Sequence, residues 1–464
     1  MMTAPAPTEA VPHQPEPVAA RPRGDLRMAA LIALLVAVTL NRYTLPLGGL
    51  HVKLEHVVLG ALLVVAAWQV VRRRGTAQLV RGPLLWIIPY VGVTGLASAV
   101  NAPNPGLGLR YTGLIALVAA GAGLVYWLAN TRTRLVIATR WLAGLGVVEA
   151  VATFGGLVAA WFWIPVATQP GRGETLVPFG TLWEPNILGS YLAAASGLLL
   201  AFLLAAPSAR RAAMLALGLV LVLAALALSL ARAAWAGAAL GALVVLAGYA
   251  WHRWATRVPL PHVRRNLTAA AVAGMLALLF LGVVAPFLFP ATVKGVFSRV
   301  DLTAYDPRVD PSVQKRVDSA AQALDAIRAH PILGNGAGSY GMSHVDPRGA
   351  PGWLANLELH LWHDSGLLGL VLVLGGLAWL TWRALRTLGR APPGGEFPAV
   401  TIGLLAAGAG LLVAFQATEA TWLGYPWVYV GLLARAGGKS ADGKRQTADH
   451  ESSVASRPSS VASR

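Results

Sequence analysis

The sequence contains no cysteine, which excludes disulfide bonds, thiolate metal sites and cysteine nucleophiles. Charged residues are scarce as well: they make up 12% of the 464 residues, whereas a soluble domain carries about a quarter. Acidic residues are the rarer sign, with 20 Asp and Glu against 37 Lys and Arg, so the net charge is +17. The chain is instead 56% hydrophobic, and this composition predicts an integral membrane protein.

Apolar runs recur along the whole chain, most of them long enough to cross ~30 Å of hydrocarbon. They are unbroken stretches of Leu, Ala, Val and Gly, unlike the short alternating segments of barrel strands. We therefore expect an all-α, polytopic protein with about twelve transmembrane helices. The expected spans are residues 28–48, 54–71, 83–100, 110–129, 134–164, 187–206, 212–230, 233–251, 267–290, 365–382, 398–417 and 421–434.

The positive charges fall into short clusters in every second connection between these spans. Basic clusters precede the first span and follow those that end at residues 71, 129, 206, 251, 382 and 434. The positive-inside rule then places both termini in the cytoplasm. A site for nucleic acid would need a contiguous basic surface, so we expect no nucleic-acid partner.

This topology divides the chain into a membrane domain and two tails. Residues 1–27 are expected to form a disordered cytoplasmic tail, and residues 28–435 the polytopic domain. Within that domain, residues 293–364 form a long extracytoplasmic loop, because long loops cross the membrane largely regardless of their charge. Residues 436–464 repeat the sequence SSVASR and are expected to be a second disordered cytoplasmic tail.

The long loop carries signals for short helices. Asp310 and Pro311 supply an N-cap and a first-turn proline, and an apolar stripe follows until Pro331, made of Val313, Val317, Ala320, Leu324 and Ile327. A second helix is expected to begin near Trp353 and to continue into the next span. The glycines at 334, 336, 338 and 341 either reverse the chain between these helices or present backbone N–H groups to a phosphate.

Three segments carry a resemblance to a known family. The first is Gly180-Thr-Leu-Trp-Glu-Pro-Asn-Ile-Leu-Gly189, in which Pro185 and Asn186 are expected to cap the following span. The second is Leu228-Ser-Leu-Ala-Arg-Ala-Ala-Trp235, and the third runs from Arg316 through His330-Pro-Ile-Leu-Gly-Asn-Gly to Ser365-Gly-Leu-Leu-Gly369. In their order and topology they resemble the O-antigen ligase and O-antigen polymerase superfamily of bacterial envelope glycan-assembly proteins.

The resemblance implies an enzyme of the cytoplasmic (inner) membrane that transfers a glycan from an undecaprenyl-pyrophosphate donor to an acceptor hydroxyl. The acceptor would be a glycan, a lipid or a protein, and membrane lipid surrounds the enzyme. It further implies that Arg232 and Arg316 bind the pyrophosphate, with no metal and no other cofactor. Candidate substrate-binding residues are Asn186, Arg299, Asn356 and Glu358.

One departure from the family pattern concerns the general base. Where the family has His-Asn, this chain has Ala355-Asn356, so the base is assigned to His360, one helical turn further on, with Glu358 and His363 as alternatives. Ligase activity is the first hypothesis and polymerase activity the second. A secondary transporter, for which Glu149 is the main intramembrane acid, and a non-catalytic relative that binds lipid-linked glycan stay open.

Overall fold

The computed structural model describes residues 25–47, 50–73, 82–164, 166–170, 176–182, 184–257, 262–300, 311–345, 352–391, 396–418 and 421–438, and this part of the chain is mostly helical. The expected tails, 1–27 and 436–464, lie almost entirely outside it. The apolar helices are α1 (Leu26–Thr39), α2 (Leu54–Arg73), α4 (Leu84–Val100), α5 (Pro105–Leu128), α6 (Arg132–Trp161), α7 (Pro185–Leu204), α8 (Ala209–Leu228), α9 (Arg232–Thr256), α10 (Val263–Leu279), α15 (Leu357–Leu388), α16 (Phe397–Ala414) and α17 (Gly424–Ala436). A π-helical turn, Phe280–Val284, joins α10 to α11 (Ala285–Leu288).

Every expected span overlaps one of these helices. Eight of the described helices are long and apolar enough to cross a membrane, while α1, α2 and α4 are apolar but shorter. The polytopic membrane fold is therefore confirmed, and the number of about twelve spans stays a prediction.

The bundle is built around α7, most of which is buried inside the protein. Small residues let the neighbouring helices approach closely. A side chain at Gly237 of α9 would come within 2.4 Å of the Gly410 carbonyl of α16, and one at Gly197 of α7 within 3.1 Å of Ala406. Helices in lipid gain little from the hydrophobic effect, so such close van der Waals packing holds them together.

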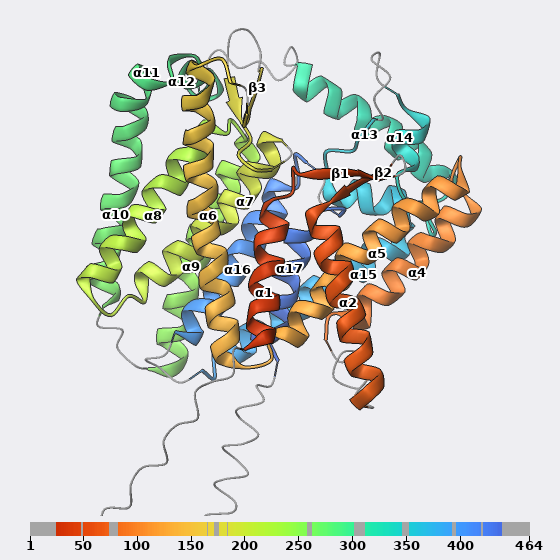
Figure 1. Ribbon diagram of the computed structural model, residues 1–464, viewed down its shortest axis with the longest axis horizontal. Coiled ribbons are helices and arrows are strands. Elements are labelled where there is room, and N and C mark those ends of the chain that lie inside the picture. Colours follow the sequence, from red (N-terminus) through yellow and green to blue (C-terminus); the bar gives the residue numbers. More distant parts are fainter. Residues whose placement is uncertain are drawn as a thin grey trace, which may run out of the picture.

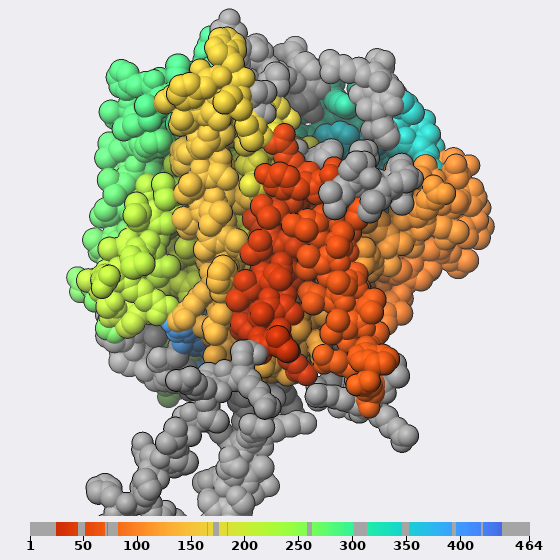
Figure 2. All heavy atoms as spheres, viewed as in Figure 1, coloured from red at the N-terminus to blue at the C-terminus, as the bar shows by residue number. Residues whose placement is uncertain are grey.

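The two ends of the described chain meet at the connection between α5 and α6. Asp25, which caps α1, accepts a bond from the Nε atom of Arg134 at 2.7 Å, and Arg435 near the end of α17 donates to the Asn130 carbonyl. The helices α13 (Pro311–Ala329) and α14 (Ser339–Ser343) lie at the opposite end of the bundle (Figure 1). On the face seen in Figure 2, α6, α1 and α2 pack side by side. This arrangement agrees with termini on one side of a membrane and the long loop on the other.

The expectation of an all-α fold was wrong in two places. β1 (Thr44–Leu47) pairs antiparallel with β2 (Leu50–Lys53), and β3 (Thr168–Pro170) pairs antiparallel with β4 (Leu176–Pro178). The expected first span, 28–48, ends early because Asn41 is buried and polar. Asn41 donates to Glu55 at 2.6 Å and accepts from Lys53 at 2.9 Å, so the chain turns back here instead of continuing through a membrane.

The long loop begins with α12 (Pro290–Val300), continues with α13 and α14, and joins α15. The expected helix before Pro331 is confirmed as α13, although its apolar stripe was partly wrong. Val317 is 55% and Leu324 42% exposed, whereas Ala323 and Ile327 are buried. The second loop helix begins at Leu357, with Asn356 as its N-cap, and not at Trp353.

The central junction of the loop is a break in α15 at Gly366, whose φ of 64° is left-handed. The break frees the carbonyls of His363 and Asp364, and these accept the N–H groups of Asn335 (2.7 Å) and Gly336 (3.0 Å). The N–H groups of Leu367 and Leu368 donate in turn to the Pro331 and Ile332 carbonyls, at 2.9 and 3.3 Å. Two helical bonds are thus exchanged for four bonds that fasten the segment 331–336 to α15.

The same segment is fastened to the end of α4. The Asn101 side chain donates to the Gly334 carbonyl at 2.7 Å, and the Ala337 N–H donates to the Ser98 hydroxyl at 2.9 Å. The glycines are needed for space as well as for their positive φ, because a Cβ at Gly336 would lie 2.6 Å from the Ser98 Cα. The chain-reversal hypothesis is confirmed, since the turn's N–H groups from Gly334 to Ser339 all donate to protein atoms.

Gly366→Ala is expected to lower the free energy of unfolding by about 3 kcal/mol, because the new Cβ would lie 2.1 Å from the Ile332 carbonyl oxygen at a left-handed φ. The matched control is Gly375→Ala in the same helix, where no atom lies within 4 Å. Thermal unfolding of the purified proteins in detergent measures both variants. Equal melting temperatures for the two would contradict the role given to the break.

Candidate functional site

A polar cavity of about 460 Å³ lies beneath the long loop, where α7 begins and α8 ends. Its walls come from six parts of the chain: β3 and β4, the start of α7, the α8–α9 turn, α12, α13 and the segment before α15. The lining residues are Gln169, Val177, Glu184, Pro185, Asn186, Ser229, Leu230, Arg299, Lys315, Arg316, Ser319, Trp353 and Ala355. We call it the arginine cavity. It brings together Asn186, Arg299 and Arg316, which are far apart in the sequence.

The N-terminus of α7 forms one wall of the arginine cavity. Pro185 takes the first helical position, as expected, but the cap residue is Glu184 and not Asn186. The Glu184 side chain makes no capping bond to the N–H groups of this first turn. The partial positive charge of a helix N-terminus therefore faces the cavity and favours an anion there.

Arg299 contacts the α8–α9 turn at another wall of the arginine cavity. The turn between α8 and α9 places Leu230 at a φ of 59°, and its carbonyl accepts a bond from Arg299 Nη1 at 3.0 Å. Arg232 is the first residue of α9, directly after this turn, and its neighbours Ser229 and Leu230 line the cavity. Arg232 itself stands beside the cavity and is not among its lining residues.

Arg316 lies on the inward face of α13. It is half-buried, and it shares this face with Ala323 and Ile327, which are buried about two and three turns further along the helix. Its Nη2 atom is 3.5 Å from the Ala417 carbonyl, at the end of α16. Lys315 is the neighbouring cation in the wall. Three cationic side chains thus converge on one cavity whose lining contains a single carboxylate, that of Glu184.

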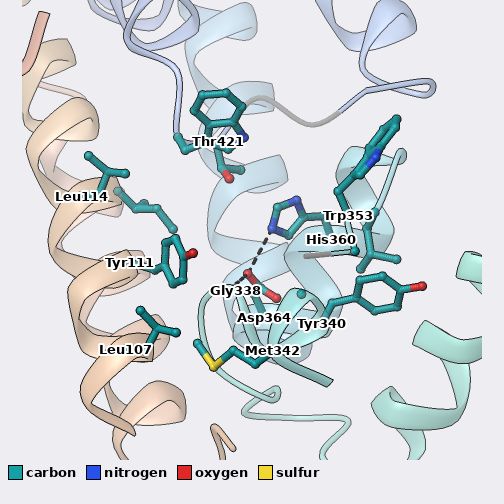
Figure 3. Close-up of a pocket in the computed structure, with 15 residues that line it drawn as sticks. Leu107, Tyr111, Leu114, Gly338, Tyr340, Met342, Trp353, His360, Asp364 and Thr421 are labelled. Atoms are coloured by element: carbon teal, nitrogen blue, oxygen red, sulfur yellow. Dashed lines mark hydrogen bonds and ion pairs between the residues drawn. The ribbon is translucent and has the colours of Figure 1, made fainter. Parts of the chain in front are cut away.

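A second cavity of about 330 Å³ adjoins the first at Trp353, which lines both. We call it the aromatic cavity, because Tyr111, Tyr340, Trp353 and Trp422 contribute to its walls. Figure 3 shows Tyr111 of α5 on one side and the pair His360 and Asp364 on the other. His360, expected to work with the arginines, therefore faces the neighbouring space.

His360 and His363 both bind Asp364. The Nε2 atom of His360 is 3.0 Å from Asp364 Oδ2, and Nδ1 of His363 is 2.8 Å from Oδ1. The Gly338 N–H donates to Oδ2 at 3.0 Å, so this carboxylate also fixes the glycine turn. All three residues are buried, at most 9% exposed. The arrangement holds the His360 ring in a fixed orientation beside the aromatic cavity.

Lys53 supports the wall of the aromatic cavity from behind. Its ammonium lies 4.1 Å from the centroid of the Trp422 ring, close enough for a cation–π interaction. Burial lowers the pKa of Lys53 to about 8, although the nearby Glu55 carboxylate acts in the opposite direction. The sequence pattern did not point to Lys53, because its partner Asn41 lies within an expected span.

Asn356 and Glu358 have other partners. Asn356 caps α15 through its bond from the Leu359 N–H at 2.8 Å, and its amide donates to Gln416 at 2.7 Å. Gln416 in turn donates to the Glu358 carboxylate at 2.8 and 3.0 Å. These two candidates tie the start of α15 to the end of α16, and they line neither cavity.

Glu149 is tied to the chain before α7. It is fully buried, and it accepts bonds from the N–H group, at 3.1 Å, and from the hydroxyl of Thr181. Among the residues with described positions, no group of three or more acidic or histidine side chains has the geometry to hold a metal ion. Glu184 and Trp353 were not chosen as site residues from the sequence; only the position of Glu184, next to the Pro185-Asn186 pair, could have drawn attention to it.

Residues 217–374 match the family model described as O-antigen ligase. This segment of the 464-residue chain is similar to the O-antigen ligase family. The matched segment runs from within α8 to within α15, and it includes Arg232, Arg299, Arg316 and His360. The resemblance seen in the sequence motifs is thereby confirmed at the level of the superfamily, whose ligases and polymerases transfer glycans in the membrane. No curated protein matches the chain.

Asp364→Asn is expected to reduce the free energy of unfolding by about 2 kcal/mol or more, since a buried acceptor of charge-assisted bonds from two imidazoles and a backbone N–H is weakened. Asp325→Asn is the matched control, because Asp325 pairs with Arg328 on the exposed face of α13. Thermal unfolding in detergent compares the two. An Asp364→Asn protein as stable as Asp325→Asn would show that the His360–Asp364–His363 cluster does not hold the loop.

Proposed function

We propose that this protein transfers a glycan from a lipid pyrophosphate, of the undecaprenyl type, to an acceptor hydroxyl at the outer face of the cytoplasmic membrane. The observation that supports this most strongly is the arginine cavity. Arg299, Lys315 and Arg316 line it together with the N-terminus of α7, at the end of the bundle that carries the long loop. A doubly charged diphosphate fits this electrostatic environment.

The chemistry needs these cations at the leaving group. As the bond between the sugar's anomeric carbon and the pyrophosphate oxygen breaks, negative charge builds up on the pyrophosphate. Guanidinium groups bind such oxygens through charge-assisted, often bidentate hydrogen bonds. Arg316 and Arg299 take this role in the proposal, and Arg232 follows directly after the turn that accepts the Arg299 bond. Asn186 provides a neutral donor at the same wall.

The acceptor is assigned to the aromatic cavity. Aromatic rings stack on the C–H faces of sugars, and Tyr111, Trp353 and Trp422 offer such rings beside the polar His360–Asp364 pair. Because Trp353 lines both cavities, an acceptor held here has a direct route to the arginine cavity. A sugar acceptor is compatible with both a ligase and a polymerase.

The proposed orientation in the membrane is based on the distribution of charge. The end of the bundle that holds Arg134 and Arg435 also holds the α9 terminus with Arg253, whereas the two cavities lie under the loop. In the proposal the basic end faces the cytoplasm and both termini lie there, by the positive-inside rule. In the proposal, Asn356 and Glu358, which both bond to Gln416, hold the start of α15 in place next to the acceptor.

Replacing Arg316 by Ala is expected to lower glycan transfer by about 100-fold or more, because a preorganised cation for the leaving group is lost. The test is a deletion strain complemented with the wild type or a variant, with the surface glycans separated on a gel. Arg328→Ala on the exposed face of α13 is the matched control and should restore the wild-type pattern.

Two results would contradict the proposal. Surface glycans that stay unchanged after deletion of the gene would remove the glycan-transfer function itself. Alternatively, Arg316→Ala, present in the membrane at the wild-type amount, could restore the glycans fully, which would remove the arginine cavity as the site.

A further inference from the structure

We infer that Glu184 is the general base of the transfer reaction, an inference that rests on the proposed function. Glu184 supplies the only carboxylate among the described residues that line the arginine cavity, and no histidine is among them. Arg299, Lys315 and Arg316 line the same space, so a proton acceptor and the cations for the leaving group stand in one chamber.

The Glu184 side chain does not point in the direction that is usual for its backbone position. It occupies the N-cap position of α7 with extended φ and ψ of −152° and 162°, where a side chain ordinarily bonds to the helix's own N–H groups. The Glu184 carboxylate makes no such capping bond. Its Oε1 atom instead accepts the hydroxyl of Thr418 at 2.9 Å, from the segment that follows α16. The side chain is thereby directed to the cavity wall.

One contact fixes the position of the Glu184 carboxylate. Thr418 is buried at 2% exposure, and its hydroxyl donates to Oε1. This bond holds the side chain at the wall of the cavity that Arg299, Lys315 and Arg316 also line.

His360 is placed less well to take the proton of an acceptor hydroxyl that attacks beside the pyrophosphate. It lines the aromatic cavity, in which no arginine or lysine is found among the lining residues. Its Nε2 atom is held by Asp364, which is itself fixed to the glycine turn. His360 thus orients an acceptor on one side of Trp353, and Glu184 receives the proton on the other.

The step balances as follows. The acceptor's oxygen forms a bond to the anomeric carbon of the donor sugar while its proton passes to a Glu184 oxygen. The bond from that carbon to the pyrophosphate oxygen breaks, and the pyrophosphate leaves with the electron pair, held by Arg299 and Arg316. The proton is then released from Glu184 to water, which restores the carboxylate. No metal or redox partner is required to balance this step.

The decisive variants are Glu184→Gln and Glu184→Asp, assayed for glycan transfer in the complemented deletion strain and in membranes prepared from it. Glu184→Gln keeps an oxygen to accept the Thr418 hydroxyl but cannot take a proton, so transfer should fall about 100-fold or more. Glu184→Asp should retain part of the activity. Asp318→Asn, an acid-to-amide change on the exposed face of α13, is the control and should transfer like the wild type.

Thr418→Val separates a catalytic role from a structural one. It removes the hydrogen bond at nearly constant volume while leaving the carboxylate in place. It should therefore lose much less transfer than Glu184→Gln. Binding of the pyrophosphate lipid is followed through the melting temperature of the purified protein with added undecaprenyl pyrophosphate, which should stabilise Glu184→Gln as much as the wild type and Arg316→Ala much less.

The outcomes distinguish a failure of the proposed function from a failure of the inference about Glu184. If Arg316→Ala abolishes transfer while Glu184→Gln transfers at the wild-type rate, the proposed function stands and the base is elsewhere, with His360→Ala as the next variant. If Thr418→Val loses as much transfer as Glu184→Gln, Glu184 is a structural residue and the inference is overturned. If deletion of the gene changes no glycan, the proposed function falls first.

Discussion

The structure depends on one exchange of backbone hydrogen bonds, at the break of α15. At Gly366 the helix gives up two of its own bonds, and the segment from Pro331 to Gly336 satisfies all four peptide groups that this frees. Buried peptide groups without partners would cost several kcal/mol each at the edge of a membrane, so the broken helix and the folded loop require each other. Asp364 strengthens the junction, because its side chain joins the glycine turn to two histidines.

This junction positions everything that the site needs. It fixes the end of α13, so that the inward face of this helix presents Arg316 to the start of α7 and to the α8–α9 turn. It also fixes His360 and Asp364 beside Tyr111, in the aromatic cavity. The membrane helices below contribute a rigid base, since glycines such as Gly197 and Gly237 bring α7, α9 and α16 into close backbone contact. A cationic chamber and an aromatic chamber that share Trp353 are the result.

Much of the fold could be predicted from the sequence, because hydropathy, charge alternation and helix signals are local. Each expected span overlaps a helix, and Pro311 and Pro331 bound α13 closely. The two hairpins were missed, since β1 depends on contacts of the buried Asn41 with Lys53 and Glu55 that no local pattern reveals. The buried face of α13 was predicted wrongly for the same reason, because tertiary contacts decide which face is buried. Val317 is apolar but exposed, whereas Arg316 faces the arginine cavity.

The candidate site was predictable only in part. Asn186, Arg299 and Arg316 were chosen from the sequence, and they do line one cavity. His360 lies in the adjoining cavity, and Asn356 and Glu358 bind Gln416, because helix phase and tertiary contacts decide where each side chain points. Glu184 and Trp353 became candidates only because the fold brings separate segments of the chain together. Residues 217–374 carry the family match, whereas Glu184 lies outside that segment.

The central claim is that the arginine cavity opens to the outer face and holds a lipid pyrophosphate, and the absence of cysteine makes a direct test possible. A single cysteine is introduced at Ser319, which lines the cavity, or at Ser208, which caps α8 at the opposite end. Spheroplasts are then treated with a membrane-impermeant maleimide. The account predicts labelling of Ser319→Cys only, with protection by undecaprenyl pyrophosphate and none by undecaprenol. Labelling of Ser208→Cys alone, or equal labelling of Ser319→Cys with and without the pyrophosphate lipid, would contradict it.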